Sequence, residues 1–103
     1  MSNLNEFLLE QLKDEEFQKE YMNQTLAQYI EDGNFSAFFR SLKLVIKSRD
    51  TISGFCEKAG IDRAMLYSVF KGERVPKVDT LAKILKTLGY SLKVAWNIIN
   101  QAT

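Results

Sequence analysis

The chain has little of what most catalytic and metal sites are built from. Its 103 residues include no histidine and one cysteine, Cys56, so imidazole is unavailable as a general base or metal ligand. One cysteine cannot form a disulfide within the chain, and a buried small thiol is its expected role. Glycine-rich phosphate loops and nucleophile motifs are also missing. These absences predict a protein that is not an enzyme and uses no cofactor or metal.

The sequence also lacks segments that would place it in or across a membrane. Its first residues have neither the basic region nor the apolar region of a secretory signal. No apolar run approaches the length that crosses a bilayer. A single cysteine gives no reason to expect an oxidising compartment. We therefore expect a cytoplasmic protein without a membrane partner.

Charge is divided unevenly along the chain. Residues 1–40 hold eight acidic and three basic residues, whereas residues 41–103 hold eleven basic and five acidic ones. Such asymmetry indicates a polyanionic partner for the basic half. The acidic half could cover a basic protein surface, or it could be a solvated face.

Apolar residues at spacings of three and four predict that most of the chain is helical. The first two stripes are Leu4, Phe7, Leu8 and Leu12, then Phe17, Tyr21, Leu26 and Tyr29, with Asp14 as the N-cap between them. The clearest stripe is Phe35, Phe38, Phe39, Leu42, Val45 and Ile46. After Pro76, Asp79 or Thr80 begins a last helix with Leu81, Ile84, Leu85 and Leu88 inside.

A switch to strict alternation at Tyr90–Trp96 predicts one short C-terminal strand. Leu92, Val94 and Trp96 would share one face of it. A lone strand leaves backbone groups unpaired, so it needs a neighbouring edge. A second subunit, a protein partner or a local hairpin with residues 97–103 could each supply that edge.

Two short helices within residues 52–71 have the spacing of a helix-turn-helix. Thr51 and Asp62 can cap them, and Gly60 can turn the chain between them. With Leu66 and Val69 turned inward, the second helix presents an outward set that suits the major groove. We predict base-reading roles for this set, which is Arg63, Ala64, Tyr67, Ser68 and Lys71. Phosphate contacts are expected from Thr51, Ser53, Arg74 and Lys77.

The order of several short motifs resembles the antidote (antitoxin) proteins of addiction modules. These motifs are Asp14-Glu15-Glu16-Phe17, Glu20-Tyr21-Met22, Glu31-Asp32-Gly33-Asn34, Ala59-Gly60-Ile61-Asp62-Arg63, Leu66-Tyr67, Pro76, Asp79-Thr80-Leu81 and Leu85–Leu92. Two positions depart from the family pattern: Arg74-Val75-Pro76 replaces the usual Gly-Asn-Pro, and Asp62 replaces the usual serine.

The resemblance implies a λ-repressor-like (Xre-type) helix-turn-helix that binds duplex DNA, represses its own operon and captures a small toxin, commonly an RNase. We expect an all-α fold in one domain over residues 1–103. It would comprise an N-terminal helical extension (1–33), a helix-turn-helix core (34–89) and the strand (90–96). A homodimer on a palindromic operator is expected, because repressors of this type extend their reach by two-fold symmetry. The alternatives are a stand-alone repressor without a toxin and a protein-interaction adaptor on the same fold.

Overall fold

A computed structural model describes residues 3–91, which form six helices and no strand. The helices are α1 (Asn3–Gln11), α2 (Glu15–Asp32), α3 (Phe35–Lys47), α4 (Ile52–Ala59), α5 (Arg63–Phe70) and α6 (Val78–Thr87). The all-helical prediction is confirmed for these residues. The predicted strand begins at Tyr90 and Ser91, which are not in a strand, and its remaining residues, with Leu92, Val94 and Trp96, lie outside the described range.

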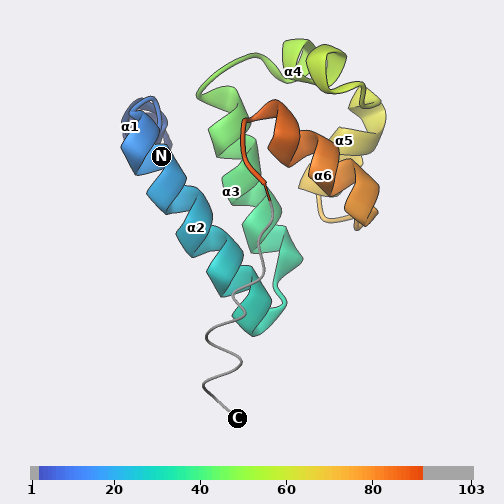
Figure 1. The fold of residues 1–103 in the computed structure, drawn as a ribbon, viewed down its shortest axis with the longest axis horizontal. Helices are drawn as coiled ribbons and strands as arrows, with labels where there is room; N and C mark the ends of the chain where they lie inside the picture. The colour runs from blue at the N-terminus through green and yellow to red at the C-terminus, as the bar shows by residue number, and fades with distance from the viewer. Residues whose placement is uncertain (1–2, 92–103) are drawn as a thin grey trace.

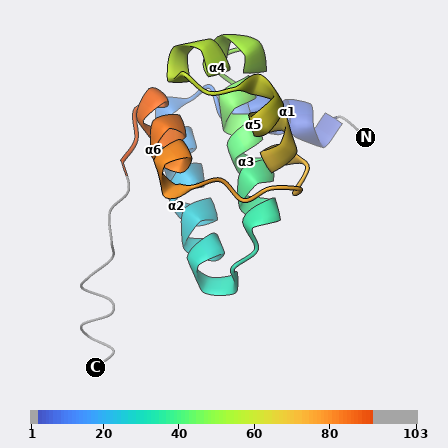
Figure 2. The same ribbon diagram turned by 90° about the vertical axis from the view of Figure 1, so that its right-hand side faces the viewer.

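Helix α3 is the centre of the fold and packs against α1, α2, α4 and α5. Helix α2 lies antiparallel beside it, with α1 at the start of α2 (Figure 1). Helices α4, α5 and α6 lie on the other side of α3 in the same view. Figure 2 shows α4 above α5 and α6 at one end of the molecule. The helices α1 and α2 of the acidic half therefore lie on one side of α3, and the short helices α4, α5 and α6 of the basic half lie on the other.

Side-chain caps set most of the helix starts. The Asp14 carboxylate accepts from the backbone N–H groups of Glu16 and Phe17, at 2.9 and 3.2 Å. Asn34 caps α3 in the same way. The prediction for α6 was wrong by one to two residues: α6 begins at Val78, with Lys77 at the N-cap and no side-chain cap. The carboxylate of Asp79 lies in the first turn instead, where the helix dipole favours it.

The predicted stripe of α3 forms the core. Phe38, Leu42, Val45 and Ile46 are at most 1% exposed. Tyr29 of α2 stacks on Phe38 with ring centroids 5.2 Å apart. Burial of apolar area of this kind is the main favourable term in folding.

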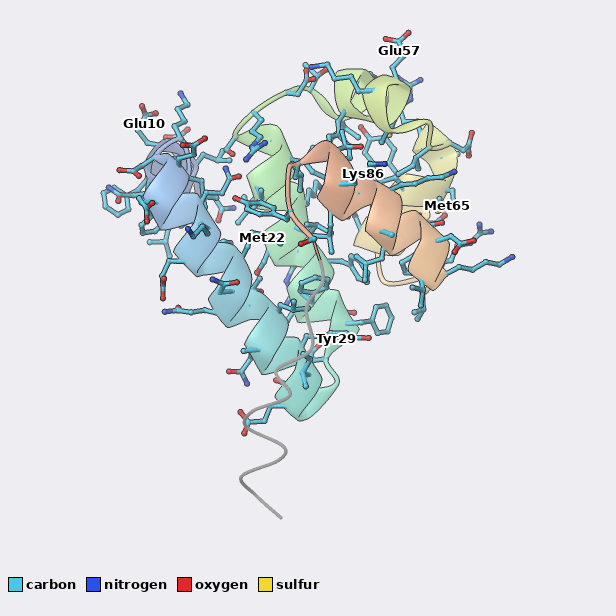
Figure 3. All side chains as sticks on the ribbon, in the orientation of Figure 1. Glu10, Met22, Tyr29, Glu57, Met65 and Lys86 are labelled. Atoms are coloured by element: carbon cyan, nitrogen blue, oxygen red, sulfur yellow. The ribbon has the colours of Figure 1, made fainter. Side chains whose placement is uncertain are left out.

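The inward face of α2 differs from the predicted stripe. Phe17 is 36% exposed, while Met22 and Gln18 are 5% and 2% exposed. Figure 3 shows Met22 on the side of α2 that faces α3. The helix is therefore rotated so that an amide, and not an aromatic ring, faces the interior near its first turn.

The Gln18 amide joins three parts of the fold. Its Nε2 donates to the backbone oxygen of Leu12 (2.8 Å) and to the Ser48 hydroxyl (3.2 Å). Its Oε1 accepts from the Arg49 guanidinium, with the Nε bond at 2.9 Å, and from the Tyr90 hydroxyl at 2.9 Å. Arg49 also donates from Nη1 to the backbone oxygen of Leu88 at 2.8 Å, and it lies over the Tyr90 ring.

Removing the Gln18 amide should destabilise the fold. Gln18→Ala removes all of these bonds: the buried Leu12 oxygen loses its side-chain partner, whereas Ser48, Arg49 and Tyr90 still reach solvent. One buried unsatisfied group costs about 1–3 kcal/mol. We expect a loss of that size in the free energy of unfolding, measured by urea denaturation. The matched control is Gln28→Ala, which removes an exposed amide bonded only to Asp32 in the same helix. Equal losses in the two variants would contradict a special role for Gln18.

Candidate nucleic-acid interface

Helices α4 and α5 are joined by a tight turn at Gly60. This residue has a φ of 70° and donates its backbone N–H to the oxygen of Cys56. Ile61 then turns inward and is 8% exposed. The Asp62 carboxylate caps α5 by accepting from the Met65 N–H at 3.0 Å. The predicted turn glycine and the two predicted caps, Thr51 and Asp62, are thus confirmed.

Helix α5 has one buried and one exposed side. Leu66 and Val69 are fully buried, as the spacing predicts. Arg63, Tyr67 and Lys71 are exposed and follow one another at intervals of four residues, with Lys71 as the C-cap of the helix. Of the other two residues predicted to read bases, Ala64 is exposed and Ser68 is half-buried.

Arg63 is held by a residue of the preceding helix. Its Nη1 donates to the hydroxyl of Ser53, in the first turn of α4. The structure therefore brings together a residue predicted to read bases and one predicted to contact phosphate. Sequence spacing gave no signal of this contact, because a bond across ten residues depends on how the two helices cross.

The other predicted phosphate contacts lie at exposed positions around α5. The Thr51 hydroxyl oxygen accepts from the Gly54 N–H at 3.0 Å as the cap of α4, and its own hydrogen can still donate. Arg74 and Lys77 are exposed in the connection between α5 and α6, with Lys77 directly before α6. Thr51 and Lys77 therefore stand at two helix starts, where backbone N–H groups favour anions.

Two of the acidic groups near these bases are engaged locally, whereas the exposed Glu57 lines a surface pocket with Ser53 and Arg63. The Lys58 ammonium bonds the Asp50 carboxylate at 2.9 Å and, with the Thr51 N–H, holds the pKa of that carboxyl below its ordinary value. The Asp62 carboxylate is taken by the cap of α5. The exposed row on α5 itself contains no acid.

Among the described residues, Cys56 forms neither an exposed reactive thiol nor part of a metal site. Its thiol is 4% exposed, and burial raises its pKa. Among residues 3–91, no group of three or more histidine, cysteine, aspartate or glutamate side chains is arranged to hold a metal ion. In the same part of the chain, no helix combines the length and apolarity needed to cross a membrane.

Residues 3–91 thus define an all-helical protein with one exposed helix face of basic, aromatic and small residues. The profile of the family described as probable addiction module antidote protein matches residues 3–96, and the chain belongs to this family. The resemblance seen in the sequence motifs is confirmed in this respect. Comparison with curated proteins and with solved structures gives no match.

The left-handed backbone at Gly60 should be the constraint that sets the direction of α5. A Cβ at this position would meet no atom within 4 Å, so Gly60→Ala adds backbone strain without a clash. We expect a loss of about 1–2 kcal/mol in the free energy of unfolding, measured by urea denaturation. Gly60→Asn should lose less, because asparagine tolerates this conformation. If alanine were no worse than asparagine, the positive φ would not be the limiting feature.

Proposed function

We propose that this chain is a sequence-specific DNA-binding antitoxin that represses its own operon and neutralises a small toxin. The exposed row of Arg63, Tyr67 and Lys71 on α5 is the observation that carries the DNA-binding part. In this proposal α3–α6 form a λ-repressor-like (Xre-type) helix-turn-helix with α5 as the recognition helix. The protein acts by binding in the cytoplasm and performs no catalysis.

The exposed side of α5 suits the major groove, which is about 12 Å wide and admits one helix. Arg63 is the first residue of α5, and residues at the start of a recognition helix are those that contact base edges. An arginine there can bond the two acceptors of one guanine. Ser53 holds the Arg63 guanidinium before DNA arrives, which reduces the freedom that the side chain loses on binding.

Phosphate contacts on either side of α5 would fix its register on the duplex. Thr51 begins α4, Lys77 precedes α6, and Arg74 lies between α5 and α6. Hydroxyl, ammonium and guanidinium groups at such positions donate to phosphate oxygens without reading sequence. The Asp50–Lys58 pair and the Asp62 cap limit the repulsion that free carboxylates would exert on this backbone.

Membership of the antidote family supports the antitoxin part of the proposal. An antidote implies a toxin partner, and the reading frame beside this gene is where its toxin is expected. Finding no toxin there would favour a stand-alone repressor. The chain would hold the toxin inactive and, through α5, limit expression of both genes.

Arg63→Ala should weaken binding to the operator by about 1–3 kcal/mol and relax preference at one base pair. Fluorescence anisotropy on the operator and on a scrambled duplex measures both effects. Lys77→Ala is the contrasting variant. It should weaken binding to both duplexes alike and reduce the slope of log affinity against log salt by about one unit. Equal loss on both duplexes for Arg63→Ala would make it a phosphate contact, and unaltered binding in both variants would contradict the interface.

The working unit is proposed to be a homodimer on a palindromic operator. One recognition helix covers few base pairs, so two-fold symmetry would place two such helices about 34 Å apart. Light scattering at micromolar concentration should give twice the chain mass of 11.9 kDa. Val94→Pro removes a backbone donor from the predicted strand and should yield monomer, whereas Ala102→Pro should not. A parent monomer, or a dimer unchanged by Val94→Pro, would exclude this strand as the dimer contact.

A further inference from the structure

The short helix α1 is anchored by only part of its apolar stripe. Leu12, which follows the helix, is fully buried, and Leu8 is half-buried against the core. The helix predicted from this stripe is confirmed, but the other two residues of the stripe, Leu4 and Phe7, are 76% and 63% exposed. Three residues apart on a helix, they share one side of it. A nine-residue helix is thus left with two large apolar side chains in water at its free end.

Acidic residues surround this apolar pair in sequence. Residues 3–20 contain six acidic and two basic residues. Glu6 and Glu10 are on α1 itself, and both are exposed. Within residues 3–91, the only ion pair of these acids is the exposed one between Glu10 and Lys13, at 3.4 Å. The exposed side of α1 that carries Leu4, Phe7, Glu6 and Glu10 therefore combines an apolar centre with negative charge, whereas Asn5 of α1 lines a pocket with Arg40, Lys43 and Lys47 of α3.

This surface lies away from the proposed DNA-reading helix. Figure 1 shows α1 at the start of α2 on one side of α3, which α1 contacts, and α5 and α6 on the other side. Glu10 of α1 and Met65 of α5 stand at opposite sides of the molecule in Figure 3. Its negative charge would repel DNA, and a partner could bind α1 while α5 remains free.

We propose that Leu4 and Phe7 dock into an apolar pocket on a basic surface of the toxin, with Glu6 and Glu10 pairing with the rim of that pocket. The proposal rests on the antitoxin function proposed above, and it names the surface that function would use. A basic protein complements this surface, whereas a second copy of the chain would bring two acidic surfaces together, which opposes association. Two side chains are too few for a whole interface, so they act as its apolar anchors.

The test uses the full chain and the protein encoded by the reading frame adjacent to its gene, purified from the co-expressed complex. Leu4→Asp/Phe7→Asp should weaken toxin binding in calorimetry by at least about 100-fold, the loss typical of anchor residues. Ile30→Asp is the matched control, because Ile30 is 74% exposed and lies on α2. It should bind as the parent does. Affinity for the operator duplex should be unchanged in both variants, which shows that they fold.

Charge reversal gives a second measurement that removes no apolar group. Glu6→Lys/Glu10→Lys should weaken toxin binding at low salt and flatten its salt dependence, whereas Glu31→Lys at the end of α2 should not. Toxin binding unchanged in all α1 variants would overturn this docking surface and leave the antitoxin function standing. A parent chain that does not bind the toxin would overturn both proposals.

Measurements on the isolated chain test whether Leu4 and Phe7 are covered by this chain itself or by a second copy of it. The thermal midpoint and the mass by light scattering should be the same for Leu4→Asp/Phe7→Asp as for the parent. A fall in the midpoint would mean that this chain itself covers the pair. A fall in mass would mean that a second copy does. Either result would overturn the proposal.

Discussion

The buried amide of Gln18 is the interaction on which the arrangement of the helices depends. It uses both ends: Nε2 donates to Leu12 and Ser48, and Oε1 accepts from Arg49 and Tyr90. A side chain that is 2% exposed cannot exchange these partners for water. Because the Gln18 amide is buried, any other arrangement of the helices would leave its polar atoms unpaired at low dielectric. The start of α2, the end of α3 and the end of α6 are therefore fixed relative to one another.

The hydrogen bonds of Gln18 also bear on the two proposed functions, DNA binding and toxin binding. Helix α3 separates the acidic helices α1 and α2 from the basic half of the chain, so each half presents its own surface (Figure 1). A polyanion and a basic protein can then be bound by one small chain without competing for residues. Because Gln18 and Arg49 connect the two halves, a displacement of α2 by a partner would be felt at the ends of α3 and α6.

The proposed reading helix is short and depends on its neighbours for its position. Eight residues make a marginal helix in isolation, so packing of Leu66 and Val69 on α3 and α4 stabilises it. Gly60 sets the direction in which it leaves α4, and Asp62 satisfies a backbone donor at its start. The Ser53–Arg63 bond then restricts the side chain proposed to matter most for specificity.

The sequence by itself determined the features that depend on local spacing. The buried stripe of α3, the caps at Asp14, Thr51 and Asp62, and the exposed row on α5 all follow from residues within two turns of each other. Only the tertiary structure decided which polar residue is buried and which large apolar residues stay exposed. Gln18 became buried while Leu4 and Phe7 stayed exposed, because burial depends on which helix covers which face. The Ser53–Arg63 and Gln18–Tyr90 bonds span 10 and 72 residues, and no local pattern encodes a contact set by helix packing.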